Sequence, residues 1–136
     1  MVVTIDYRFN DEWILNSGCA YHICHYRDWF TTYEHRDSNS VLLGNDASCQ
    51  TVGIGTVRIR TKNGVVRTLS NVQHVQELKK NIISLGSLDS AGHMFSTQGG
   101  TMKISRGSLI MMKGKRVKDI YILQGNTVTG SAFQRI

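Results

Sequence analysis

Proline is absent from this 136-residue sequence, and cysteine occurs only three times. Without proline, the turns of the chain must rely on Gly, Asn, Asp and Ser. An odd number of cysteines makes a poor disulfide framework, and the sequence contains no N-x-[ST] glycosylation site. These absences favour a reduced, intracellular protein over a secreted one.

Long apolar runs are missing as well. No stretch approaches the roughly 20 apolar residues that span a bilayer. The first residues, MVVTIDYRFNDE, lack the basic and then apolar form of a signal peptide. We therefore expect no membrane partner. A composition of 40% hydrophobic and 19% charged residues is typical of a globular chain, and the length suits one compact domain with at most a short appended element.

Acidic residues are nearly absent from the last quarter of the chain. Residues 1–99 hold nine basic and nine acidic side chains, whereas residues 100–136 hold seven basic side chains against Asp119 alone. The net charge of +6 arises in this quarter, which suggests a second element with its own role. Residues 103–118 could neutralise the phosphates of a nucleic acid, or they could be a solvated hairpin face. The cations considered as phosphate contacts are Lys113, Lys115, Arg116 and Lys118.

Short strand-like runs separated by turn residues fill the sequence. In TVGIGTVRIRTKNGVVRTL, Val57 and Ile59 alternate with arginines, as a half-buried strand requires, and Asn63-Gly64 predicts a tight hairpin turn. Three later runs, TMKIS, SLIMMK and DIYIL, are also typical of strands. We expect Gly107 and the basic turn Gly114-Lys115-Arg116 to separate them.

The stretch NIISLGSLDSAG differs from these runs. Its mixed apolar spacing favours a short helix, which Asn81 or Ser84 could cap and Gly92 could end. The following HMFST is typical of a return strand. Several short strands with one small helix predict an all-β barrel or sandwich.

The stretch WILNSGCAYHICH contains the densest group of chemically active residue types. A zinc site is one interpretation of its cysteines and histidines, but four ligands within seven positions could hardly surround one ion tetrahedrally. A Cys-His nucleophile would lack a third group to orient the histidine. We therefore expect no metal and no cofactor, and Cys24 to be a small core residue. The side chains concerned are Cys19, His22, Cys24 and His25.

A family resemblance gives this stretch a context. The segments WILNSGCAYHICHYRDWFTTYE, VLLGNDASCQTVGIGTVRI and GVVRTLSNVQHVQELKKNIISLGSLDSAGHMF resemble, in order and spacing, the protease segment of copia-type retrotransposon polyproteins. The tail GGTMKISRGSLIMMKGKRVKDIYILQG resembles the segment that follows it, ahead of the integrase zinc-binding region. Together the resemblance covers roughly residues 12–125.

The resemblance implies an all-β, retropepsin-like fold: a small closed β-barrel with one short C-terminal helix, followed by an extra β-hairpin-like element. It also implies a homodimer in which each subunit gives one loop to a shared active site, with a polypeptide as the ancestral substrate. The implied location is intracellular and cytoplasmic, ancestrally in a virus-like particle. The expected divisions are residues 1–10 (N-terminal extension), 11–97 (barrel), 98–125 (basic pre-integrase-like β segment) and 126–136 (tail).

By the same resemblance, Asn16-Ser17-Gly18 occupies the position of the family's catalytic Asp-[Ser/Thr]-Gly loop. Gly44, Gly53 and Gly55 would belong to a flap over the substrate, as hinges or as simple bulge glycines. His22 would be a hydrogen-bonded structural residue next to the loop.

Asn16 is the departure that decides the expected activity. In an aspartic protease, two nearby carboxylates share one proton and activate a water molecule. An amide has almost the same shape, but it has no accessible protonation change and cannot accept the proton of the water. We therefore predict an aspartic endopeptidase domain for polyprotein processing that is inactive as written. The alternatives are a non-enzymatic dimerisation or interaction barrel and a basic nucleic-acid-binding module.

Overall fold

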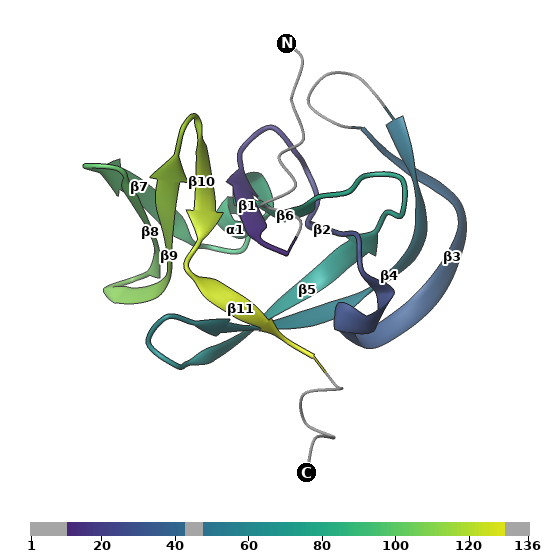
Figure 1. Cartoon of the computed structure of the whole chain (residues 1–136), viewed down its shortest axis with the longest axis horizontal. Coiled ribbons are helices and arrows are strands. Elements are labelled where there is room, and N and C mark those ends of the chain that lie inside the picture. Colours follow the sequence, from purple (N-terminus) through teal and green to yellow (C-terminus); the bar gives the residue numbers. More distant parts are fainter. Residues whose placement is uncertain (1–10, 43–47, 130–136) are drawn as a thin grey trace.

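The computed structural model describes residues 11–42 and 48–129, which form eleven strands, one α-helix and a 3-10 turn at Arg27–Trp29 (Figure 1). The all-β class with one short helix is confirmed. In the described residues, no helix is long and apolar enough to cross a membrane. In chain order the elements are β1 (Trp13–Asn16), β2 (Ile23–Cys24), β3 (Phe30–Leu42), β4 (Ser48–Thr61), β5 (Val66–His74), β6 (Asn81–Ser84), α1 (Leu85–Ser90), β7 (Met94–Gln98), β8 (Thr101–Arg106), β9 (Leu109–Val117), β10 (Ile120–Leu123) and β11 (Gly125–Val128).

Strand β1 lies inside the sheet, with a neighbour on each side. It runs parallel to β6, with Asn16 opposite Ser84, and antiparallel to β10, with Leu15 opposite Tyr121. Its residues Trp13, Ile14 and Leu15 are all buried. The Asn16-Ser17-Gly18 loop therefore leaves the sheet from a strand that is fixed on both edges.

The last two strands join distant parts of the sheet. The hydrogen-bonded order is β11-β4-β5-β2-β6-β1-β10-β9-β8-β7, so the ladder is open where a closed barrel was expected. However, only Gln124 separates β10 from β11, and the two strands follow one another across the molecule (Figure 1). The Gln124 backbone accepts a hydrogen bond from Lys62 N at 3.2 Å and donates one to Lys113 O at 2.8 Å. The covalent chain thus connects the two ends of the five-strand path from β4 to β1.

Strands β3, β4 and β5 form the long antiparallel part of the sheet. Val57 and Ile59 are completely buried, which confirms the predicted alternation in β4. The hairpin at Asn63-Gly64 is also confirmed, because it connects β4 to β5. Trp13 links β1 to β11, the other neighbour of β4, since its indole N–H donates to Thr127 Oγ1 at 2.8 Å.

The predicted helix is shorter than the stretch from which it was inferred. Residues NIIS form the fully buried strand β6, and only the six residues of α1 are helical. Ser84, one of the two expected caps, accepts a hydrogen bond from Ser87 N through its side chain. The apolar Ile82 and Ile83 prefer the strand because both faces of β6 are buried in the sheet.

The expected basic turn at Gly114-Lys115-Arg116 is wrong. Strand β9 continues through these residues to Val117, and the chain turns at Lys118 and Asp119. Gly114 is buried, and a Cβ atom at this position would lie 2.4 Å from Leu15 Cδ1. Because Gly114 has no side chain, Leu15 of β1 can pack closely against β9. Close packing of this kind is a common reason for a glycine within a strand.

Two groups of buried side chains form the core of the described residues. The larger one combines Trp13, Leu15 and Ile83 from the centre of the sheet with Val57 from β4 and Leu123 from β10. It also contains side chains of β8 and β9, so the last quarter of the chain contributes to the same core. The smaller one contains Cys19, Ile23, Val75 and Ile82.

The expected division of the chain stays a prediction. Residues 1–10 lie outside the described part of the structure. The boundary after residue 97 falls within β7, and the boundary after residue 125 falls within β11. The sheet is continuous across both positions.

Candidate functional site

The Asn16-Ser17-Gly18 loop is a tight turn held by its own first side chain. Asn16 Oδ1 accepts a hydrogen bond from the Gly18 backbone N–H at 2.5 Å. This is the bond by which Asn and Asp stabilise turns, and a carboxylate oxygen could accept it equally well. Asn16 is half-buried, whereas Ser17 and Gly18 are exposed. The loop conformation therefore forms without a carboxylate and remains open to a ligand.

Ser84 connects this loop to the start of α1. Its hydroxyl donates to Cys19 O at 2.6 Å and accepts from Ser87 N at 3.0 Å. Ser84 is completely buried and lies opposite Asn16 in the parallel register of β1 and β6. One side chain thus fixes both the second half of the loop and the first turn of the helix.

His22 lies on the inner side of the same loop. Its Nδ1 accepts a hydrogen bond from Ser84 N at 2.9 Å, so the ring nitrogen facing Ser84 carries no proton. Burial and, to a lesser extent, the neighbouring His93 together lower the pKa of His22 to about 4. At neutral pH the imidazole is uncharged and acts as an acceptor, an arrangement suited to a structural residue. The structural role of His22 that the family resemblance implies remains a prediction.

A cavity of about 550 Å³ opens beside the loop. Asn16 and Ser17 line one wall, and Leu85 of α1 adds an apolar side chain. Further lining residues come from the last quarter of the chain, including Asp119 and Tyr121, and Tyr121 pairs with Leu15 of β1. The sequence did not identify these last two residues, because nothing in their own pattern indicates that β10 pairs with β1. The cavity is therefore built by segments about a hundred residues apart.

The glycines assigned to a flap do not line this cavity. Gly53 and Gly55 lie in β4, where added Cβ atoms would come within 2.1 Å of the Tyr33 ring and 1.9 Å of Thr32 O. Their absence of a side chain allows β3 and β4 to pack closely. Gly44 lies outside the described residues. A flap role for these glycines stays a prediction.

The cysteine and histidine group of the opening stretch is dispersed. In the residues that the structure describes, no three His, Cys, Asp or Glu side chains are placed to hold a metal ion. Cys19 and Cys24 are buried free thiols. Burial raises the pKa of Cys24 to about 12, so its thiol stays protonated and is a poor nucleophile.

The four cations proposed as phosphate contacts do not share one face. Lys113 and Lys115 are exposed and lie two positions apart on β9, so their side chains point to the same face. Arg116 directly follows Lys115, so its side chain points to the other face of the strand, and it pairs with Tyr121. Lys118 lies in the turn between β9 and β10.

Comparison of the sequence with known protein families identifies the family of this chain. The family described as "Pol polyprotein, beta-barrel domain" matches residues 13–93 of the chain, from the start of β1 to just before β7. The chain belongs to this family. The match includes the Asn16 loop, Ser84 and α1, and it ends before β7, β8 and β10, which supply further lining residues of the cavity.

Two transposon proteins are similar in sequence to this Pol polyprotein β-barrel domain. A retrovirus-related Pol polyprotein from transposon TNT 1-94 of Nicotiana tabacum is 32% identical over 103 residues, which are 76% of this chain and 8% of that protein. A putative transposon Ty5-1 protein of Saccharomyces cerevisiae is 33% identical over 76 residues, covering 56% of this chain and 49% of that protein. The resemblance to copia-type retrotransposon polyproteins is thereby confirmed. No solved structure matches the chain.

Proposed function

We propose that this domain is a retropepsin-like unit of a retrotransposon Pol polyprotein, descended from an aspartic endopeptidase and unable to cut peptides because of Asn16. The observation that carries the proposal is the turn at residues 16–18. The turn follows an apolar strand and lines a cavity. Its Asn16 amide oxygen accepts the Gly18 N–H bond that one oxygen of a carboxylate would accept. Its ancestral substrate would be an extended polypeptide of the polyprotein.

The predicted lack of activity follows from the chemistry of the amide. A carboxylate pair accepts a proton from water and shares another, whereas a pair of amides can do neither. Loss of general acid–base catalysis alone lowers a rate by about 10²- to 10⁴-fold. The hydrogen bond from Gly18 N–H to Asn16 Oδ1 does not restore this catalysis, because it stabilises the turn and transfers no proton.

Dimerisation is part of this proposal, because one chain supplies one loop. Strand β7 lies at the end of the described sheet, and all five of its residues are exposed. Met94 and Phe95 are 68% and 41% exposed, respectively. An unpaired edge with large apolar side chains favours pairing with another chain. Phe95 also lines the Asn16 cavity, so a second copy bound along β7 would lie beside the loop. The same edge supports the alternative of a non-enzymatic dimerisation domain.

Restoring the carboxylate tests the proposal directly. We expect Asn16→Asp to cut a fluorescently labelled unfolded polypeptide between pH 5 and 7, at least about a hundredfold faster than the unaltered chain. The cleavage should be blocked by pepstatin and should depend on dimer formation, followed by sedimentation. The turn should survive, because the new carboxylate can accept the Gly18 N–H bond.

Asn126→Asp provides the matched control. Asn126 is exposed on β11, so this variant makes the same chemical change away from the cavity and should stay inactive. A folded, dimeric Asn16→Asp protein without activity would contradict the protease ancestry. Cleavage by the unaltered chain would contradict its predicted inactivity.

A further inference from the structure

Basic side chains from two distant segments form one continuous surface. On the sheet of β8 and β9, Lys103 and Lys113 lie directly opposite one another, and Lys115 lies two residues further along β9 on the same face. All three side chains are exposed. Like charges in directly opposite positions destabilise a sheet, so this arrangement costs stability unless an anion binds there.

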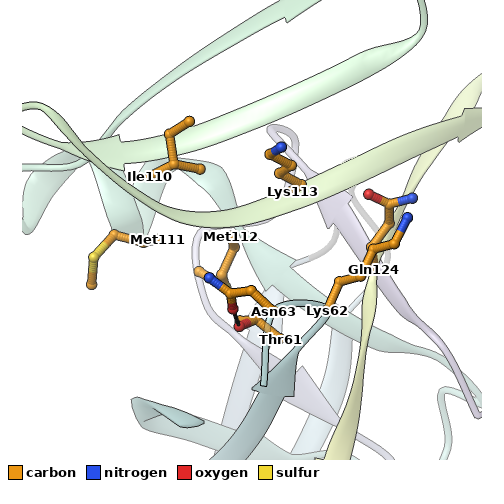
Figure 2. A pocket seen from close by; sticks show the side chains of 8 residues that line it. All are labelled: Thr61, Lys62, Asn63, Ile110, Met111, Met112, Lys113 and Gln124. Carbon is orange, nitrogen blue, oxygen red and sulfur yellow. Dashed lines mark hydrogen bonds between the residues drawn. The ribbon is translucent and has the colours of Figure 1, made fainter. Parts of the chain in front are cut away.

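The hairpin between β4 and β5 extends this surface. Lys62 and Lys113 line the same cavity of about 330 Å³, shown in Figure 2. Gln124 holds them together, because its backbone is bonded to Lys62 N and to Lys113 O. Arg60 lines a neighbouring cavity with Lys62, where Glu12 is the acidic member. We call Arg60, Lys62, Lys103, Lys113 and Lys115 the basic track.

The cavity in the middle of the track has an apolar lining. Ile110, Met111 and Met112 line it together with the two lysines, and Ile110 and Met111 lie on the side of the cavity away from Lys62 and Gln124 (Figure 2). Its volume of about 330 Å³ is at the lower end of the range for small-molecule pockets, which suits one planar ring system. A base can enter such a cavity only when it is unstacked, as in a single strand.

We propose that the basic track binds a single-stranded nucleic acid, with the lysines and Arg60 on successive phosphates and one unstacked base in the cavity beside Ile110. This function is separate from the proposed protease ancestry, since the track and the Asn16 cavity have no lining residue in common. The contacts involve the phosphate backbone and an apolar surface, so binding shows little sequence preference.

The affinity for a labelled 12-nucleotide single-stranded RNA, measured by fluorescence anisotropy at several KCl concentrations, tests this proposal. Each neutralised phosphate adds about −0.7 to the slope of log K against log salt for a single strand. Lys103→Gln with Lys113→Gln should therefore make the slope about 1.4 units shallower and weaken binding about twentyfold at 0.1 M salt. Ile110→Ala removes apolar contact but no charge, so it should weaken binding about threefold and leave the slope unchanged.

A second double variant, Arg116→Gln with Lys79→Gln, has the same net charge and serves as the matched control. Arg116 lies on the opposite face of β9, and the exposed Lys79 lies outside the track. Circular dichroism checks that both double variants fold. The proposal predicts that the control changes the affinity less than threefold.

Three results would overturn the proposal. Equal losses in the two double variants would mean that net charge alone attracts the RNA. A duplex that binds as tightly as the single strand would remove the role of the cavity. Polyglutamate that displaces the RNA at equal charge concentration would point instead to an acidic protein as the ligand.

Discussion

Gly125 is the residue on which the junction between β10 and β11 depends, and its replacement by alanine tests that junction. A Cβ atom at this position would lie 2.6 Å from Arg60 O and 3.3 Å from Thr61 Cα. Both obstructing atoms belong to the backbone of β4, which pairs with β11 through Gly125 opposite Thr61 and Asn126 opposite Arg60. The new methyl group can therefore be accommodated only by moving one strand away from the other.

The expected cost follows from this geometry. Overpacking a well-packed site costs about 1–3 kcal/mol, and a lengthened backbone hydrogen bond adds about 1 kcal/mol. The lower entropy of the unfolded alanine chain offsets about 0.4–1 kcal/mol. We expect Gly125→Ala to lower the free energy of unfolding by about 1–3 kcal/mol, measured by urea denaturation. With a slope of about 1–3 kcal/mol per molar urea, the midpoint should fall by about 1 M.

Gly86→Ala is the matched control for this experiment. The nearest heavy atom to a Cβ at Gly86 is Ser84 Oγ at 3.8 Å, and the residue lies within α1. The same substitution should therefore raise stability by about 0.5–1 kcal/mol, since alanine is the better helix former. If Gly125→Ala were as stable as the unaltered chain, close pairing of β11 with β4 would be refuted.

Two further predictions concern the inner side of the Asn16 loop. Because burial lowers the pKa of His22 to about 4, the unfolded chain binds the proton more readily, and we expect stability to fall by about 2–3 kcal/mol as the pH falls from about 6.5 to 4. In His22→Asn, whose amide can still accept the Ser84 bond, the urea midpoint should lose this part of its pH dependence; an unchanged profile would contradict the assignment. Iodoacetamide should modify the half-buried Cys49 before Cys19 and Cys24 in the native protein, as followed by mass spectrometry, and early modification of Cys24 would contradict its burial.

The local features of this fold could be predicted from the sequence because they depend on neighbouring residues. Alternation around Val57 and Ile59 identified β4, and Asn63-Gly64 identified its hairpin turn. Ser84 was one of two expected caps, since a serine side chain can bond to the backbone N–H three residues later. The 16–18 turn has the same local origin, because Asn16 bonds to a backbone group two residues away.

The strand partners could not be predicted in this way. Pairing of β1 with β10 joins residues about a hundred positions apart, and strand propensity does not specify a partner. The expected turn at Gly114 shows the consequence. Locally, a glycine beside two cations is typical of a turn, but the contact with Leu15 of β1 requires a glycine inside a strand. The contribution of Asp119 and Tyr121 to the Asn16 cavity depends on the pairing of β1 with β10. The approach of Lys62 to Lys113 depends on two other long-range or unpredicted pairings, β11 with β4 and β10 with β9.

This pairing also bears on how the chain divides into units. The family match ends at residue 93, yet β10 occupies one edge of β1 and β11 occupies one edge of β4. A chain ending at residue 97 would leave both edges without these partners and would remove Met102, Ile104, Met112 and Leu123 from the main core. It would also take away Thr127, the acceptor of the Trp13 indole bond. The basic segment that resembles a pre-integrase element therefore supplies strands and core side chains to the same sheet as residues 13–93, and its cations project from those strands.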